Sequence, residues 1–291
     1  MEFNMSTFID GLSLGSIYAL IALGYTMVYG IAKMLNFAHG DIIMVGSYAI
    51  LTTLLLNGHP LLAIIAAVVI CTVLGVLIEK LAYKPLRGAS PLAVLITAIG
   101  VSYFLQSVAQ LIFGAQTHPI SLVHFPPVVI GGVTISVSAI ISLVVGALIM
   151  ILLTLFIKFT KLGRAMIAVS EDRAAAKLMG INVNMIIMVT FAIGSALAAF
   201  ASTFYVMQIP NTSPTLGSMP GIKAFTAAVI GGIGSIPGAM LGGVLMGVVE
   251  KISLSIPVLA PYTTALEFSL LIIILLVKPT GLLGKKRREK V

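Results

Sequence analysis

Between Arg87 and Lys158 the sequence contains no aspartate, glutamate, lysine or arginine. A soluble domain, in which about 25% of residues are charged, does not tolerate an uncharged stretch of that length. The rest of the chain is similar, with 59% hydrophobic and 9% charged residues. Apolar surface on this scale must be solvated by lipid, and about 20 apolar residues suffice for each crossing. We therefore predict an all-α polytopic membrane protein with about eight or nine transmembrane helices.

The apolar stretches are separated by short polar or glycine-rich segments. We predict helices at residues 9–30, 37–56, 61–80, 92–113, 135–157, 185–207, 221–235, 238–256 and 263–277. The two glycine-rich pieces within 221–256 could be a pair of thin spans or one re-entrant hairpin. We expect one transmembrane domain over 1–291, with a first half-repeat (about 9–113) and a second (about 135–277) that contains a cytoplasmic loop at 158–184.

The basic residues are clustered beside apolar stretches, which is the pattern of the cytoplasmic face of a membrane protein. Three clusters hold 14 of the 17 lysines and arginines: Lys80, Lys84 and Arg87; Lys158, Lys161, Arg164, Arg173 and Lys177; Lys278, Lys285, Lys286, Arg287, Arg288 and Lys290. This arrangement predicts a bacterial inner-membrane protein with a cytoplasmic C-terminus and an extracytoplasmic N-terminus. It also indicates that the basic residues behind the net charge of +8 contact anionic lipid headgroups rather than nucleic acid.

Two breaks in the apolar pattern occupy corresponding positions in the two predicted halves. Irregular backbone survives at membrane depth where it is buried in protein or lines water, so paired breaks point to a transport pathway. We predict that the breaks form a translocation path or a hinge, unless their glycines only allow close helix packing. The candidate residues are Asn36, His39, Gly40 and Asp41 in the first break and Gly231, Gly232, Gly234 and Gly238 in the second.

Charged side chains inside membrane spans are costly and are therefore functional candidates. Asp41 is either part of a polar lining or a cap for the helix that follows it, and we favour the cap. For Glu250, Lys251 and Glu267 we expect an interfacial position rather than a binding site.

The longest polar interruption, 158–184, carries the signals of a short helix at the membrane surface. Ser170 is a candidate N-cap, Glu171 and Asp172 suit the first turn, and alanines including Ala175 favour helix. Gly180 provides a stop. Such a helix is too short to be stable alone, so we expect it to dock against a partner.

The pattern Glu-Asp-x-x-Ala-Ala-x-x-x-Gly-Ile-Asn in this loop resembles the coupling loop of ABC-importer permeases. Other stretches resemble the LivH-type permeases of branched-chain amino-acid importers: GLSLGSIYALIALGYTMVYGI (11–31), MLNFAHGDIIMVGSYA (34–49), KAFTAAVIGGIGSIPGAMLGGVLMG (223–247) and KPTGLLGKK (278–286). At position 41, Asp stands where relatives frequently have Glu.

The resemblance implies a permease subunit that forms the pathway for branched-chain amino acids. It implies three kinds of protein partner: a second, related permease subunit, two cytoplasmic ATPase subunits, and an extracytoplasmic substrate-binding protein that selects the ligand. Glu171, Asp172, Ala175 and Gly180 would then couple ATP hydrolysis to transport.

Motifs for chemistry within this chain are missing from the sequence. It has no G-x-x-x-x-G-K-[S/T] phosphate loop, so we expect ATP and Mg²⁺ to be bound by partner subunits. It also lacks an H-E-x-x-H helix and a G-x-S-x-G elbow, so we predict no enzyme, no metal site and no cofactor. Permeases for urea or short amides share much of the pattern, so the cargo stays open, as does pairing with an identical or a different permease. An autonomous secondary transporter or channel is the rival from another class.

Overall fold

A computed structural model describes residues 5–123, 125–130 and 133–284 and is almost entirely helical. The helices are α1 (Met5–Ala32), α2 (His39–Leu55), α3 (Pro60–Ile78), α4 (Pro91–Phe113), α5 (Val137–Phe159), α6 (Lys161–Glu171), α7 (Arg173–Leu178), α8 (Val183–Gln208), α9 (Ser218–Gly231), α10 (Ile236–Ser255) and α11 (Thr263–Val277). Among the described residues, seven helical segments are long and apolar enough to cross a membrane. The predicted all-α, polytopic fold is confirmed.

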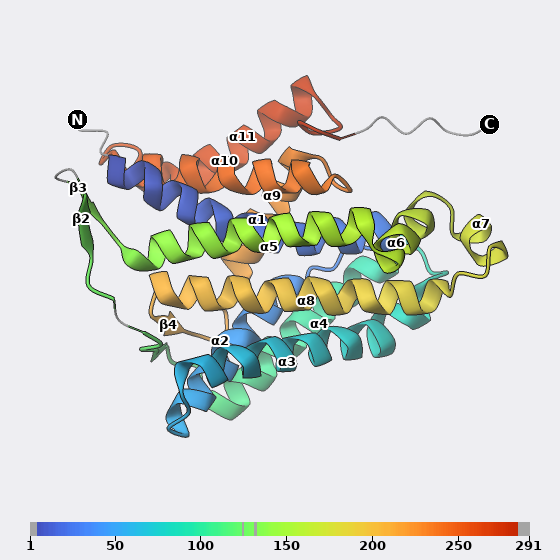
Figure 1. The fold of residues 1–291 in the computed structure, drawn as a ribbon, viewed down its shortest axis with the longest axis horizontal. Helices are drawn as coiled ribbons and strands as arrows, with labels where there is room; N and C mark the ends of the chain where they lie inside the picture. The colour runs from blue at the N-terminus through green and yellow to red at the C-terminus, as the bar shows by residue number, and fades with distance from the viewer. Residues whose placement is uncertain (1–4, 124, 131–132, 285–291) are drawn as a thin grey trace.

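The transmembrane helices run side by side, and α1 lies in their centre (Figure 1). Helix α1 is buried along most of its length and packs against α10, α8, α5 and α9. By contrast, α3, α4, α5 and α11 expose most of their side chains, many of them large and apolar. A periphery this apolar would suit water poorly, whereas it suits a helix bundle surrounded by lipid or by further membrane subunits.

Helices α1 and α10 pack at the distance of touching backbones. A Cβ atom added at Gly243 would lie 2.3 Å from the backbone nitrogen of Ala19, and one at Gly247 would lie 2.1 Å from that of Gly15. Small residues drive helix association in membranes because they allow this close approach. The glycine stripe of α10 is therefore a packing surface against α1.

Two of the nine predicted helices are shorter than the seven candidate spans, which have at least 18 helical residues each. At 1.5 Å per residue, α2 with 17 residues and α9 with 14 extend about 25 Å and about 21 Å, less than a hydrocarbon core of about 30 Å, whereas α11 reaches 18 residues with the helical turn before it. The segment 221–256 is therefore divided into two unequal helices. Helix α9 is a short helix, and α10, which follows a four-residue break, is a full candidate span.

Short strands tie the connections at one end of the bundle together, at the end opposite α6 and α7 (Figure 1). Strand β1 (His118–Pro119) pairs antiparallel with β4 (Asn211–Thr212), and β2 (Val128–Ile130) pairs with β3 (Val133–Ile135). The β1–β4 pair joins the loop after α4 to the loop after α8, which are the two uncharged loops in 114–134 and 208–220.

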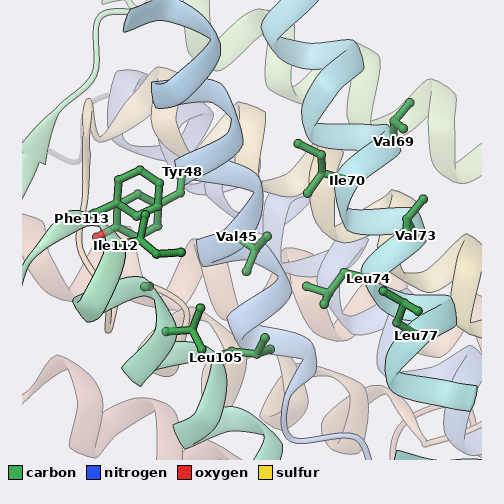
Figure 2. A pocket seen from close by; sticks show the side chains of 12 residues that line it. Val45, Tyr48, Val69, Ile70, Val73, Leu74, Leu77, Leu105, Ile112 and Phe113 are labelled. Carbon is green, nitrogen blue, oxygen red and sulfur yellow. The ribbon is translucent and has the colours of Figure 1, made fainter. Parts of the chain in front are cut away.

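A groove lies between α3 and α4, and residues of α2 line it between them (Figure 2). Its volume is about 430 Å³, and the side chains that line it are almost all hydrocarbon: Val45, Tyr48, Val69, Ile70, Val73, Leu74, Leu77, Leu105, Val108, Ala109, Ile112 and Phe113. At the end of the groove the rings of Tyr48 and Phe113 stack with centroids 4.3 Å apart. Helix α4 thus contacts the bundle mainly through α2 and the turn after α3, and one such contact involves Asp41.

Candidate functional site

The first break is an irregular segment, 33–38, that leads from the end of α1 to the start of α2. Asn36 is buried within it, and its Oδ1 accepts a hydrogen bond of 2.9 Å from the hydroxyl of Tyr83. Tyr83 is the last residue of a π-helical turn, Glu79–Tyr83, that continues α3. The break is therefore fastened to α3 through side chains.

His39 begins α2 and is buried against α1. A Cβ atom at Gly24 would lie 2.2 Å from its Nε2, so the missing side chain of Gly24 makes room for the imidazole. The ring of Tyr25 meets the imidazole edge-on at 4.8 Å. The start of α2 consequently lies level with Gly24, well inside the span of α1.

The N-terminal ends of α2 and α9 meet inside the bundle. A Cβ atom at Gly40 would lie 2.5 Å from the carbonyl oxygen of Gly217, and one at Gly217 would lie 2.1 Å from the carbonyl oxygen of Gly40. Gly221, one turn into α9, faces the Cα atom of Gly40. Two short helices thus point their positive dipole ends at a common place, an arrangement that favours negative charge there.

Asp41 occupies this place, and its carboxylate reaches α4. Its Oδ1 accepts a hydrogen bond of 2.9 Å from Nε2 of Gln106, which also lies 3.3 Å from the hydroxyl of Ser218 at the start of α9. The interpretation of Asp41 as a helix cap is wrong: Ala38 occupies the N-cap position and no side chain caps the helix. The helix begins before Asp41, so the carboxylate extends from the side of the first turn toward α4.

The second break, residues 232–235, is closed by protein. Gly232 and Gly234 have φ values of +104° and +94°, which side chains other than glycine rarely adopt. The amides of Leu282 and Leu283 donate to the carbonyls of Ile230 and Gly231 at 2.8 and 2.9 Å, so the segment after α11 satisfies the C-terminal end of α9.

Gly231 and Gly238, on either side of this break, face each other. A Cβ atom at Gly231 would lie 1.9 Å from the carbonyl oxygen of Gly238. The structure therefore places Gly40 and Asp41 at the N-terminal end of α9 and Gly231 and Gly238 at its C-terminal end, about 21 Å away, while Asn36 contacts the turn after α3 and His39 contacts α1. Gly231 and Gly238 lie in a packing contact between α9 and α10, whereas Gly232 approaches Thr280 and Gly284 after α11 and Gly234 faces Gly30 on α1.

At the end of the bundle opposite β1–β4, the loop 158–184 forms two helices where one was predicted. Thr160 caps α6 by accepting from the amide of Gly163 at 3.0 Å. Asp172, not Ser170, caps α7, and its Oδ1 accepts from the amides of Ala174 and Ala175 at 2.8 and 3.0 Å. The prediction for Ser170 is wrong because α6 runs through it, and its hydroxyl bonds back to Ile167 inside that helix.

Helix α7 ends as the glycine predicts. Gly180 has φ +81°; its amide donates to Lys177, and the amide of Ile181 donates to Ala176. These two bonds form a Schellman motif, in which a residue in the left-handed region ends the helix. Glu171 is the last residue of α6 and is exposed, and Ala175 is exposed on α7.

Arg173 fixes α7 to the end of α1. Its guanidinium donates to the carbonyl oxygens of Ile31 and Ala32, which lack partners within α1. Burial, and to a smaller extent the nearby Arg87, lower the pKa of Arg173 from its ordinary value. Arginine nevertheless stays charged at physiological pH, so this cation complements the negative end of α1.

Anchored in this way, α7 presents an apolar edge. The side chains of Leu178 and Met179 are 89% and 81% exposed, whereas Ala176 is buried. A helix outside the spans has no lipid tails to contact, so exposed apolar residues at its tip mark a contact surface. The residues Lys285, Lys286, Arg287, Arg288 and Lys290 of the basic tail lie outside the described part of the chain.

Sequence analysis missed the polar partners within the spans. Gln106 gave no signal because one amide in α4 is unremarkable. Lys223 was recognisable as a lone lysine in an apolar helix, but the expected interfacial position of Glu250 and Glu267 gave no reason to pair them with it. Glu267 is fully buried and pairs with Lys223. Within the described ranges, no three His, Cys, Asp or Glu side chains are grouped so as to hold a metal ion.

Comparisons with known proteins agree along nearly the whole chain. Residues 7–276 match the family model described as the permease component of branched-chain amino acid transport systems. The chain is 48% identical to the permease protein BraD of a high-affinity branched-chain amino acid transport system in Pseudomonas aeruginosa, over 97% of this chain and 96% of BraD. It is 43% identical to LivH of Escherichia coli, a permease protein of the same kind of system, with the same coverage.

A solved structure shares the fold. PsaBC from Streptococcus pneumoniae, determined in complex with a Fab, aligns with a TM-score of 0.50 over 93% of this chain and 91% of that chain. The sequences are 17% identical, so the likeness concerns the fold alone.

Proposed function

The chain belongs to the family of permease components of branched-chain amino acid transport systems, and from this premise we propose that it is the membrane-spanning subunit of an ATP-driven importer of branched-chain amino acids. The relatives are transport permeases rather than enzymes. ATP and Mg²⁺ are bound by two separate cytoplasmic ATPase subunits. A second, related permease completes the pathway, and an extracytoplasmic binding protein delivers the substrate.

The observation that carries this proposal is the anchored, apolar tip of α7. Leu178 and Met179 are exposed at the end of a helix that Arg173 ties to the C-terminus of α1. A partner that binds this tip can displace α1, the central helix of the bundle. Glu171, Asp172, Ala175 and Gly180 act in this coupling through the ends and the exposed side of the helix pair.

The sidedness follows from the positive-inside rule applied to the folded chain. Arg87 donates to Asn184 at the start of α8, so the first and second basic clusters lie at one end of the bundle, the end of α6 and α7. We assign this end to the cytoplasm and the β1–β4 end to the outside, where a binding protein would dock. The N-terminus is then extracytoplasmic and the C-terminus cytoplasmic.

The first break supplies the part of the pathway that the two halves share. Gly40 and Asp41 lie where the N-termini of α2 and α9 meet, and the buried Asn36 and His39 add polar groups beside them in the same break. Gly231, Gly232, Gly234 and Gly238 form a hinge at the other end of α9. Both assignments are parts of the proposal, as is the division into half-repeats.

Replacing an exposed apolar residue of α7 by a charged one tests the coupling surface. We expect Leu178→Asp to insert normally but to lose co-purification of the ATPase subunits and ATP-driven leucine uptake in proteoliposomes. Val258→Asp is the matched control, since Val258 is 76% exposed in the connection between α10 and α11, at the opposite end. Full uptake by Leu178→Asp, or uptake by the wild-type chain alone on an ion gradient without ATP, would refute the proposal. Uptake of urea in place of leucine would overturn the cargo only.

A further inference from the structure

Four polar side chains from four helices meet inside the bundle. The ammonium of Lys223 on α9 lies 2.8 Å from Oε1 of Glu250 on α10 and 3.1 Å from Oε1 of Glu267 on α11. The hydroxyl of Tyr18 on α1 donates to the other oxygen of Glu250 at 2.7 Å. We call these four residues the charge cluster. Its two carboxyl groups flank a single ammonium.

The charge cluster lies deep in the bundle. Tyr18 is near the middle of the 28-residue helix α1, and Glu250 lies more than one helical turn before the end of α10. Glu267 is fully buried, and the side chains of Lys223 and Glu250 are about nine-tenths buried. A net charge in such a place is expensive, because a buried ion without a partner costs several kcal/mol.

The cluster carries one negative charge too many if every group is ionised. Two carboxylates contribute −2, the ammonium contributes +1 and the tyrosine none. Beyond the cluster, Tyr205 on α8 faces Glu250, and Lys251 on α10 lies near Asp10 on α1, so this second pair of opposite charges leaves the balance unchanged. One bound proton would make the cluster neutral.

The hydrogen-bond donors around the two carboxyl groups show which of them is less stabilised in its ionised form. Glu250 accepts from the hydroxyl of Tyr18 and pairs closely with Lys223. Glu267 has the longer contact to Lys223 and faces the carboxyl group of Glu250, and among the described residues no hydroxyl or amide group donates to its two buried oxygens. Glu250 is thus better stabilised as an anion, and Glu267 is the group that lacks donors.

We propose that the charge cluster is an intramembrane proton-binding site, in which Glu267 holds one proton at neutral pH and Glu250 is the counter-ion of Lys223. This inference goes beyond the transport function and is independent of the cargo. Its structural consequence concerns α11, in which only Thr263 and Glu267 are buried. Because Glu267 is one of so few buried anchors, loss of the proton places an unbalanced charge at the contact that holds α11 to α9 and α10.

Infrared spectroscopy of the full chain in lipid nanodiscs tests the proposal directly, since a protonated carboxyl group has a C=O band that a carboxylate lacks. At pH 7 we expect a band in the wild type that corresponds to one carboxyl group and is lost in Glu267→Gln. Glu250→Gln should lose it too, because Glu267 then ionises to pair with Lys223. Lys223→Gln should strengthen it. Asp41→Asn is the control for a buried acid outside the charge cluster and should keep the band.

Thermal unfolding provides the second readout. The folded wild type binds a proton that the unfolded chain releases above about pH 4.3, so its stability should fall as the pH rises from there. Glutamine mimics the protonated acid in both the folded and the unfolded state, so Glu267→Gln should match the wild type near pH 4, exceed its stability at pH 7 and lose this pH dependence. A wild-type spectrum without the band, or a band and a pH dependence that survive in Glu267→Gln, would overturn the proton site. If that variant does not fold, the wild-type spectrum with Asp41→Asn and Lys223→Gln still decides.

Discussion

The contact between the two short helices predicts that a single methyl group at Gly217 separates them. Gly217 has φ −74° and ψ −19°, values that alanine adopts without strain, so Gly217→Ala changes only the contact. The added Cβ would lie 2.1 Å from the carbonyl oxygen of Gly40, about 1.3 Å closer than an ordinary contact of 3.4 Å. The obstructing atom belongs to the backbone and cannot rotate away, so the starts of α2 and α9 must move apart.

The magnitude follows from two opposing effects. Overpacking costs about 1–3 kcal/mol, and replacing glycine by alanine returns about 0.5–1 kcal/mol of backbone entropy. We expect Gly217→Ala to lower the free energy of unfolding by about 1–2 kcal/mol. Gly100→Ala is the matched control on α4, because a Cβ there would meet nothing within 4 Å. It should gain the entropic term and raise stability by about 0.5–1 kcal/mol.

Both variants are compared by denaturant-induced loss of helical circular dichroism in one detergent, alongside leucine uptake by the assembled transporter. Uptake should fall in Gly217→Ala, because Asp41 moves with the start of α2, and should be unchanged in Gly100→Ala. If Gly217→Ala proves as stable as Gly100→Ala, the two helix starts do not touch and the geometry of the first break is refuted.

Three further predictions concern the ends of the helices. Gly180→Ala should strain the φ +81° position by about 1–2 kcal/mol and raise the ATP hydrolysed per substrate imported, whereas Gly88→Ala, which meets nothing within 4 Å, should leave that ratio unchanged. Arg173→Gln should cost about 1.5–3 kcal/mol of charged hydrogen bonding and speed amide hydrogen exchange in α7, and unchanged exchange would contradict the anchor. Tyr83→Phe should leave the buried Asn36 without its donor and lower the free energy of unfolding by about 1–3 kcal/mol, while a neutral effect would show that the bond is not formed.

Helix positions were predictable because each apolar segment in lipid must satisfy its own backbone hydrogen bonds and therefore forms a helix whatever it packs against. The nine predicted segments correspond to helices, and their ends differ by a few residues at most. Gly180 was predictable for a similar reason, since a left-handed residue that ends a helix is a local requirement. Ser170 was wrong within the same loop because Ser and Asp are both good caps, and only the docking of α6 against α5 and α8 selects Asp172.

The sequence by itself determined that this chain lives in a membrane, where its helices lie, and which family it belongs to. Hydrophobicity and the residue preferences of helix ends depend on neighbours within one or two helical turns, so the local sequence is enough to predict them. Only the tertiary structure decided that α2 and α9 meet at Gly40 and Gly217, and that Lys223 lies between Glu250 and Glu267. Those residues are far apart in sequence, and the free-energy cost of burying each charge depends on which distant residues desolvate or neutralise it.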